Sequence, residues 1–254
     1  MIQISKSISL LILFCLAFTL LSGQAIITDR PDQTESSSTV GNGNLQIETG
    51  ILIGFEGESE NSTRQLLAPT SLFRYGITKN IEIRFLSQFE SIKNGNRDVQ
   101  GISDIEIGTK VQLLKDDSKN TEIAFLSHLI MPTGSKELTN GGFGSINKLS
   151  ISHEVNQRVG LGYNLGYNYF GNGKGDLTYS LALGIGVNSK VGIYIEPYGD
   201  FVDFEKHLSN FDAGFTYLAN DNLQYDFSFG TGINNRMNYI SLGFSWLMNR
   251  TEVN

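Results

Sequence analysis

Residues 158–169 read RVGLGYNLGYNY, a stretch in which large and small side chains alternate. One parity carries only Val, Leu and Tyr, from Val159 to Tyr169, and the other carries only Gly and Asn, from Gly160 to Asn168. Because a β-strand sends alternate side chains to opposite faces, one face of this strand is apolar and the other is nearly bare. A soluble sandwich would place the apolar face in a core, whereas a transmembrane barrel would turn it toward lipid.

The same period of two recurs along the whole chain after Leu45, and no stretch of useful length shows the helical period. Each run is about ten residues long, which matches the 9–11 residues that a tilted strand needs to cross a membrane and exceeds the 5–6 residues of an ordinary strand. The second run is blurred, and the fifth is apolar on both parities. The predicted strands are 45–55, 65–76, 80–90, 102–114, 121–132, 145–154, 158–170, 177–188, 190–202, 209–218, 222–233 and 238–248.

Long and short connections broadly alternate between these runs, as with EGESENST, then ITKN, then IKNGNRDVQG. This rhythm is typical of outer-membrane barrels, which have short periplasmic turns and longer outer loops. Closure also removes the unpaired strand edges that lipid would not tolerate. The sequence therefore predicts an all-β fold, an antiparallel up-and-down transmembrane β-barrel of about 12 strands, within a range of about 10–14. A secreted soluble sandwich or barrel is the alternative.

Residues 1–25 have the features of a cleaved signal peptide: Lys6, an apolar run from Ser9 to Leu21, and small residues at Gly23 and Ala25. A membrane anchor is the weaker alternative, because the apolar run is shorter than the roughly 20 residues of a spanning helix. Cleavage would remove Lys6 and the only cysteine, Cys15, and would change the net charge from −7 to −8. This acidic balance argues against nucleic acid as a partner. We expect an irregular segment over 26–44 and a single barrel over 45–254.

Charged residues on the polar parities are predicted to line the lumen, where they could set selectivity or form a structural network that fills the barrel. The segment ITDRPDQTE could enter the lumen as a plug, with Arg30 meeting carboxylates and with Asp29 and Asp32 meeting Arg84 or Lys110; a solvated tail is the alternative. Tyr194 and Tyr198 share the parity of Glu196. The predicted lumen-lining residues are Glu48, Arg74, Glu82, Arg84, Asp104, Glu106, Lys110, Glu196, Asp212 and Asp226.

No catalytic residue, metal site or cofactor is predicted. Ser150 and Ser152 share one face of their strand while His153 points to the other, so neither serine can pair with that histidine. His128, His153 and His207 are far apart and have no ligand spacing.

Five stretches in a fixed order resemble one known family. They are ITDRPDQTES (27–36), YGITKNIEIRF (75–85), GISDIEIGTKVQL (101–113), MPTGS (131–135) and FDAGFTYLANDNLQYDFSFGTGIN (211–234). The chain resembles over nearly its whole mature length the outer-membrane barrels labelled "putative meta-pathway phenol-degradation protein" or "transporter". The resemblance implies a small barrel in the outer membrane of a Gram-negative bacterium, and it implies no catalytic residues.

The sequence thus predicts a channel or transporter, not an enzyme, that sits in outer-membrane lipid and passes a small, apolar or aromatic solute. A non-conducting structural barrel is the second hypothesis, with partners bound by the loops 56–64, 91–101 and 133–144. An outer-membrane enzyme is the third. Neutralising Glu106 and Lys110 would alter conductance under the first hypothesis and only stability under the second. The sequence does not indicate an oligomeric state.

Overall fold

The computed structural model describes residues 26–57 and 62–249, so the predicted signal peptide lies outside the described residues. Within those ranges all regular structure is β. No helix there is long and apolar enough to cross a membrane. The strands are β1 (Leu45–Glu56), β2 (Thr63–Gly76), β3 (Ile81–Asn94), β4 (Arg97–Ile102), β5 (Ile105–Asp116), β6 (Thr121–Met131), β7 (Gly144–Asn156), β8 (Val159–Tyr169), β9 (Asp176–Gly186), β10 (Val191–Val202), β11 (Lys206–Asn220), β12 (Leu223–Gly232) and β13 (Met237–Met248).

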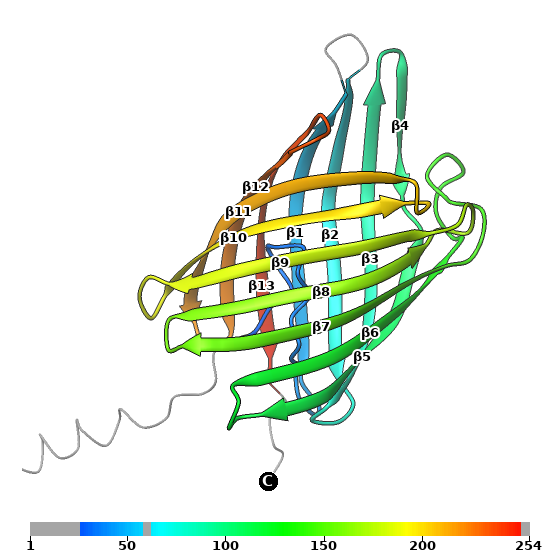
Figure 1. The fold of residues 1–254 in the computed structure, drawn as a ribbon. Helices are drawn as coiled ribbons and strands as arrows, with labels where there is room; N and C mark the ends of the chain where they lie inside the picture. Colours follow the sequence, from blue (N-terminus) through cyan, green and yellow to red (C-terminus); the bar gives the residue numbers. More distant parts are fainter. Residues whose placement is uncertain (1–25, 58–61, 250–254) are drawn as a thin grey trace, which may run out of the picture.

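The strands form one closed antiparallel barrel (Figure 1). Strands adjacent in sequence pair with each other, except β4 and β5, and β1 closes the sheet by pairing with β13. Residues 89–94 of β3 pair with β4, and residues 81–86 pair with β5. The strands β4 and β5 together therefore occupy one position in the barrel. The predicted twelve-strand barrel is therefore confirmed.

The largest departure from the predicted boundaries is at the fourth run, which starts earlier, at Arg97, and is interrupted at Ser103 and Asp104. The interruption is caused by a contact between Asp104 and a later connection of the chain. The Asp104 carboxylate accepts hydrogen bonds from the backbone N–H groups of Gly134 and Asn140, at 2.8 and 2.9 Å. Asp104 thus holds the 132–143 connection onto the barrel rim instead of continuing the strand ladder.

The blurred pattern of the second run also has a structural cause. The β2 register shifts between Leu67 and Thr70, next to Pro69, which has no N–H to offer to a ladder. Before the shift Leu67 pairs with the buried Glu90, and after it the inward residues include Arg74. The bulge therefore moves the inward face of β2 from odd to even positions.

The two ends of the barrel differ. One end, here called the turn end, carries β1's start, β13's finish and the short connections 77–80, 157–158 and 221–222. The other, the loop end, carries the longer connections, including 132–143 and 170–175. The N-terminal residues, blue in Figure 1, run inside the barrel before β1 begins.

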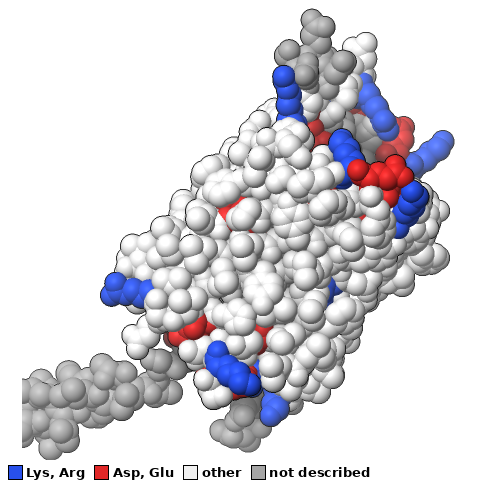
Figure 2. Space-filling view, viewed as in Figure 1, with Lys and Arg blue, Asp and Glu red and all other residues white. Residues whose placement is uncertain are grey.

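The outer surface is an apolar band. Figure 2 shows charged side chains gathered near the two ends and a face between them that is almost free of charge. Leu165 and Leu242 are about 60% exposed, at 60% and 61%, and Ile83 and Phe85 are also exposed. On β6 the apolar residues of the second parity, Leu126 and Ile130, are buried inside, which explains why this run is apolar on both parities.

Candidate functional site

Residues 26–44, here called the plug segment, cross the lumen without forming a helix or strand. Several of their backbone N–H groups donate to side chains of the barrel wall. Glu48 accepts from the N–H groups of Asp29 and Arg30, at 2.9 and 3.0 Å, and Glu82 accepts from that of Val40 at 2.9 Å. Since a buried N–H without a partner is costly, these carboxylates are what allows an irregular segment to lie inside a barrel.

The wall formed by β2, β3 and β5, here called the basic wall, carries Arg74, Arg84 and Lys110, all at most 1% exposed. Arg74 and Arg84 stand directly opposite each other on neighbouring strands. Such a like-charge pair is destabilising unless carboxylates lie between the two groups. Glu82 Oε1 accepts from Arg74 Nε and from Arg84 Nη1, each at 2.9 Å.

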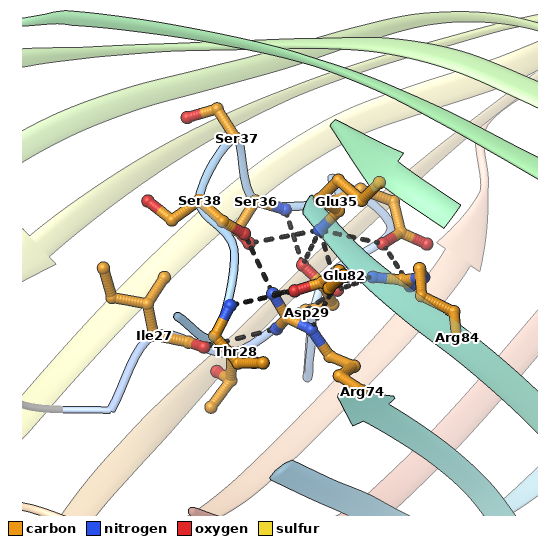
Figure 3. Close-up of polar contacts among 12 residues, drawn as sticks. Ile27, Thr28, Asp29, Glu35, Ser36, Ser37, Ser38, Arg74, Glu82 and Arg84 are labelled. Atoms are coloured by element: carbon orange, nitrogen blue, oxygen red, sulfur yellow. Dashed lines mark hydrogen bonds and ion pairs between the residues drawn. The ribbon is translucent and has the colours of Figure 1, made fainter. Parts of the chain in front are cut away.

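Asp29 of the plug segment completes the basic wall (Figure 3). Its carboxylate lies 2.6 Å from Arg84 Nη1, 2.8 Å from Lys110 Nζ and 3.3 Å from Arg74 Nη1. Burial alone would raise the pKa of Asp29, but these three bases outweigh it and hold the pKa well below its ordinary value. Asp29 is therefore a buried anion matched to three buried cations.

The following residues continue the contacts along the same side. Glu35 Oε2 lies 2.8 Å from Arg84 Nη2. The hydroxyl of Ser38 donates to Glu122 at 2.6 Å, and the hydroxyls of Ser37 and Ser152 lie 2.5 Å apart. The side chains of residues 35–38 thus bind the plug segment to β3, β6 and β7.

His128 on β6 links the basic wall to Glu106. Arg84 Nε can only donate, so His128 Nε2 accepts its hydrogen bond, at 2.9 Å. The proton of the ring then sits on Nδ1, which donates to Glu106 at 2.7 Å. In this arrangement the imidazole is neutral, and its two hydrogen bonds connect Glu106 to Arg84.

The opposite wall, formed by β10, β11 and β12 and here called the acidic wall, carries Glu196, Asp212 and Asp226. Glu196 and Asp212 are directly opposite each other on adjacent strands. Arg30 of the plug segment binds Asp226 through both Nη2 and Nε, at 2.8 and 3.2 Å. Glu196 accepts from the backbone N–H of Gln33 at 2.7 Å and from the hydroxyl of Thr34.

Asp32 lies beside the acidic wall. Burial and the negative charge of Glu196, with smaller contributions from Asp212 and Asp29, raise the pKa of Asp32 well above its ordinary value. The plug segment therefore presents an acid to the basic wall and, through Arg30 and the Gln33 N–H, positive groups to the acidic wall. Asp32 is the exception to this complementarity.

Two glycines make room for the Arg30 guanidinium. A side-chain carbon added to Gly243 would lie 2.4 Å from Arg30 Nη2, and one added to Gly50 would lie 2.6 Å from the same atom. Gly50 and Gly243 are paired on β1 and β13. The guanidinium thus lies flat against a bare stretch of wall on its way to Asp226.

Cavities remain on either side of the plug segment. A cavity of about 960 Å³ opens at the turn end, between residues 38–41 of the plug segment and the connections around Asn80 and Asn222. Cavities of about 410 and 340 Å³ lie between the plug segment and the wall formed by β8, β9 and β10. A smaller one of about 150 Å³ lies toward the loop end, near Asn168 and Asp200.

The structure brings most of the predicted lumen residues into contact with the plug segment. Glu48, Arg74, Glu82, Arg84, Lys110, Glu196 and Asp226 all touch it, Asp212 lies beside them, and Glu106 reaches it through His128 and Arg84. Asp104 does not, because it binds the 132–143 connection at the rim. The pairing expected for Asp32 is wrong, since its charged neighbours are carboxylates, not Arg84 or Lys110.

Several contact residues were not predicted, among them Thr34, Glu35, Glu122 and His128. Glu122 and His128 lie on inward parities. Their partners, Lys115 for Glu122 and Arg84 and Glu106 for His128, lie on neighbouring strands and are brought close only by the register of the folded barrel. The serine–histidine arrangement finds no support: His153 binds the hydroxyls of Thr121 and Tyr163, at 2.9 and 3.1 Å. Among residues 26–57 and 62–249 no group of His, Cys, Asp or Glu could hold a metal ion.

The geometry agrees with what comparison with known proteins finds. A family described as "Putative MetA-pathway of phenol degradation" matches residues 28–247. The chain belongs to this family. No curated protein matches it. The family match begins at Thr28, so it includes most of the plug segment as well as the barrel.

Among solved structures, one titled "KdgM porin in complex with disordered oligogalacturonate" has a TM-score of 0.57 and 9% identity, over 80% of this chain and 99% of that one. A second KdgM porin structure has a TM-score of 0.53 and 10% identity, over 79% and 99%. A "CymD monoaromatic hydrocarbon channel" gives a TM-score of 0.48 and 10% identity, over 84% and 90%. At these identities the likeness to the KdgM structures shows the shared barrel fold alone.

Proposed function

We propose that the protein is an outer-membrane channel whose lumen is closed by the plug segment in this state and which passes a small solute when the plug moves. The observation that carries the proposal is the double complementarity of the plug segment: Asp29 completes the basic wall, and Arg30 and Gln33 complete the acidic wall. A barrel that needed only a filled interior could use wall side chains. A separate segment that is joined to β1 can leave the lumen and return to it, which allows a pore to open and close.

Placement in the outer membrane is supported by the apolar outer band and by strand lengths. Aliphatic and aromatic side chains such as Ile83, Phe85 and Leu165 face outward without a covering layer. A contiguous exposed apolar surface of this kind is stable in lipid and not in water. A signal peptide cleaved before residue 26 would deliver the chain to the periplasm, so the turn end, with both termini, would face the periplasm.

For the solute, we propose a small aromatic compound that carries a hydrogen-bonding group, in preference to a purely apolar one. The cavities beside the plug segment are lined by Tyr194 and Tyr198 together with hydroxyl and carboxylate groups such as those of Ser180 and Asp32. A purely apolar solute would leave these polar groups without partners in a narrow lumen.

The test is single-channel conductance of the mature protein in a planar bilayer, with and without residues 26–43. We expect rare or brief openings in the intact protein. We expect sustained conductance after the deletion, because it removes all of the plug segment except Asn44. Well-folded, water-soluble protein that does not insert would overturn the membrane placement.

A non-conducting structural barrel is the second candidate, and one observation favours it: the bases Arg74, Arg84 and Lys110 are all buried in ion pairs, which is the arrangement of a filled interior. Stable insertion with no conductance in either form of the protein would support this candidate over the channel.

A further inference from the structure

On the turn half of the wall formed by β8, β9 and β10, three glycines face open space. A side-chain carbon added to Gly160 would find its nearest neighbour, the His153 carbonyl oxygen, only at 4.0 Å. The corresponding distance is 3.9 Å at Gly184 and 3.7 Å at Gly186. At Gly50 and Gly243, in contrast, the space is taken by Arg30. Gly160, Gly184 and Gly186 therefore keep a void open, whereas Gly50 and Gly243 make room for the Arg30 side chain.

The void is continuous along the turn half of this wall. The cavities of about 410 and 340 Å³ share Asp32, Gly160, Gly184 and Tyr194 in their linings. The cavity toward the loop end is lined by Asn164 and Ser180, further along β8 and β9, and by Lys148 of β7. One short stretch of the plug segment separates the two sides.

That stretch is Gln33–Glu35, here called the gate loop. The Thr34 and Ser180 hydroxyls lie 2.6 Å apart, and the backbone N–H of Glu35 donates to Asn164 Oδ1 at 2.7 Å. The Gln33 N–H donates to Glu196. Asn164 and Ser180 are cross-strand neighbours on β8 and β9, so the gate loop spans the wall at one level.

We propose, on the basis of the channel function proposed above, that solute crosses the barrel along the β8–β10 wall and that movement of the gate loop alone opens this path. Asp29 remains seated in the basic wall, where it faces three buried bases within 3.3 Å. The gate loop is held differently: its one ion-paired side chain, Glu35, is partly exposed, and Gln33 and Thr34 bind the wall through hydrogen bonds to Glu196. Residues 33–35 are therefore the part of the plug segment whose movement would join the cavities on its two sides.

The charges at the gate loop set the class of solute. Glu196 and Asp212 face it from β10 and β11, Asp32 lies next to it, and Glu35 is already paired with Arg84. The bases Lys148 and Arg158 line the cavities on the loop side and the turn side and make no ion pair with the gate loop in the part of the chain that the structure describes. The path therefore takes neutral or cationic solutes with hydrogen-bonding groups and excludes small carboxylate anions.

Two disulfide locks in the full mature chain test the path. Thr34→Cys with Ser180→Cys would fix the gate loop, and Ser37→Cys with Ser152→Cys would fix the plug segment just beyond it. The two hydroxyl pairs are 2.6 and 2.5 Å apart, so sulfur atoms at either pair come within bonding reach. Cys15 lies in the predicted signal peptide, so after cleavage each variant would contain no other thiol.

We expect the Thr34–Ser180 lock to abolish conductance until a reductant is added, and the Ser37–Ser152 lock to leave conductance within about twofold of the unlocked protein. Conductance that persists through the first lock would overturn the path, and loss of conductance in both locks would show that the whole plug segment must move. Absence of conductance in the unlocked protein and in the deletion lacking residues 26–43 would instead refute the channel function itself.

The reversal potential in a KCl gradient tests the solute class. Conducting protein should prefer K⁺ over Cl⁻, and Glu196→Gln should reduce that preference while Glu205→Gln, at an exposed position of the loop end, should not change it. A preference for Cl⁻ in the unmodified protein would overturn the assignment of neutral or cationic solutes.

Discussion

The Lys110 ammonium donates hydrogen bonds to both carboxylate oxygens of Asp29, at 2.8 and 2.9 Å, although 81 positions separate the two residues. Asp29→Asn would leave three buried bases with one carboxylate fewer. Breaking a buried pair costs about 3–5 kcal/mol. We expect the docked state of the plug segment to lose about 3 kcal/mol or more, which corresponds to roughly a hundredfold rise in the ratio of released to docked plug segment. Single-channel recording measures this ratio as openings to the conductance of the protein lacking residues 26–43, separate from gate-loop openings in which Asp29 stays in place.

The matched control is Asp117→Asn, which removes the same charge from an exposed turn. It should leave the ratio of released to docked plug segment unchanged. If the two variants behaved alike, Asp29 would not hold the plug segment in place.

The plug segment should also respond to pH through Asp32. Its pKa is raised by burial and by Glu196, so the docked state holds a proton that the released state gives up. The stabilisation from Asp32 is therefore present below its ordinary pKa of 3.8 and is lost as pH rises from there toward the raised value. Asp29 acts oppositely, since its lowered pKa makes docking weaker only as pH falls below 3.8.

Between pH 4 and pH 8, the open fraction should consequently rise in the unmodified protein. Asp32→Asn removes the titrating proton and should flatten this dependence, with a lower open fraction at neutral pH. Recordings across this pH range check the prediction, with exposed Asp98→Asn as the control that keeps the original slope. An open fraction that falls with rising pH would contradict it.

Gly243 should matter through Arg30. A methyl group at this position would lie 2.4–2.6 Å from Arg30 Nη2, Nε and Cζ, so the flexible guanidinium would have to move away and weaken its pair with Asp226. Gly243→Ala is expected to raise the fraction of protein with the whole plug segment released several-fold. Gly160→Ala adds the same methyl group where the nearest heavy atom is 4.0 Å away, and it should have little effect on gating. Equal effects of the two substitutions would rule out steric displacement of Arg30.

Alternation of side chains was sufficient to predict the fold because the barrel wall has a period of two on most strands. It failed on β6, where Leu126 and Ile130 are apolar side chains inside the barrel, and where the backbone departs from that period. At Pro69 a bulge shifts the inward face of β2, and at Asp104 a rim contact interrupts the fourth strand. Neither cause is visible in the pattern, since the first is a change of register and the second a contact with residues 30 positions away.

The site was harder to predict than the wall. Parity places Arg74 and Glu196 inside, but it does not say that they form opposite basic and acidic walls, because that depends on how the barrel closes. The plug segment has no periodicity at all. Its arrangement follows from side-chain partners such as Asn164 and Glu196, which only the folded barrel brings together.

The apolar band makes the final prediction, which concerns the membrane itself. Leu165 lies at the middle of β8 and is 60% exposed on the outer face. Leu165→Arg should reduce the free energy of folding into lipid vesicles by about 2–4 kcal/mol, because a lipid-facing charge is most costly at mid-depth. Phe143→Arg, at an equally exposed position in the 132–143 connection, should cost about 0–1 kcal/mol. Denaturant titrations in vesicles measure both values, and a soluble barrel would instead tolerate the two substitutions equally.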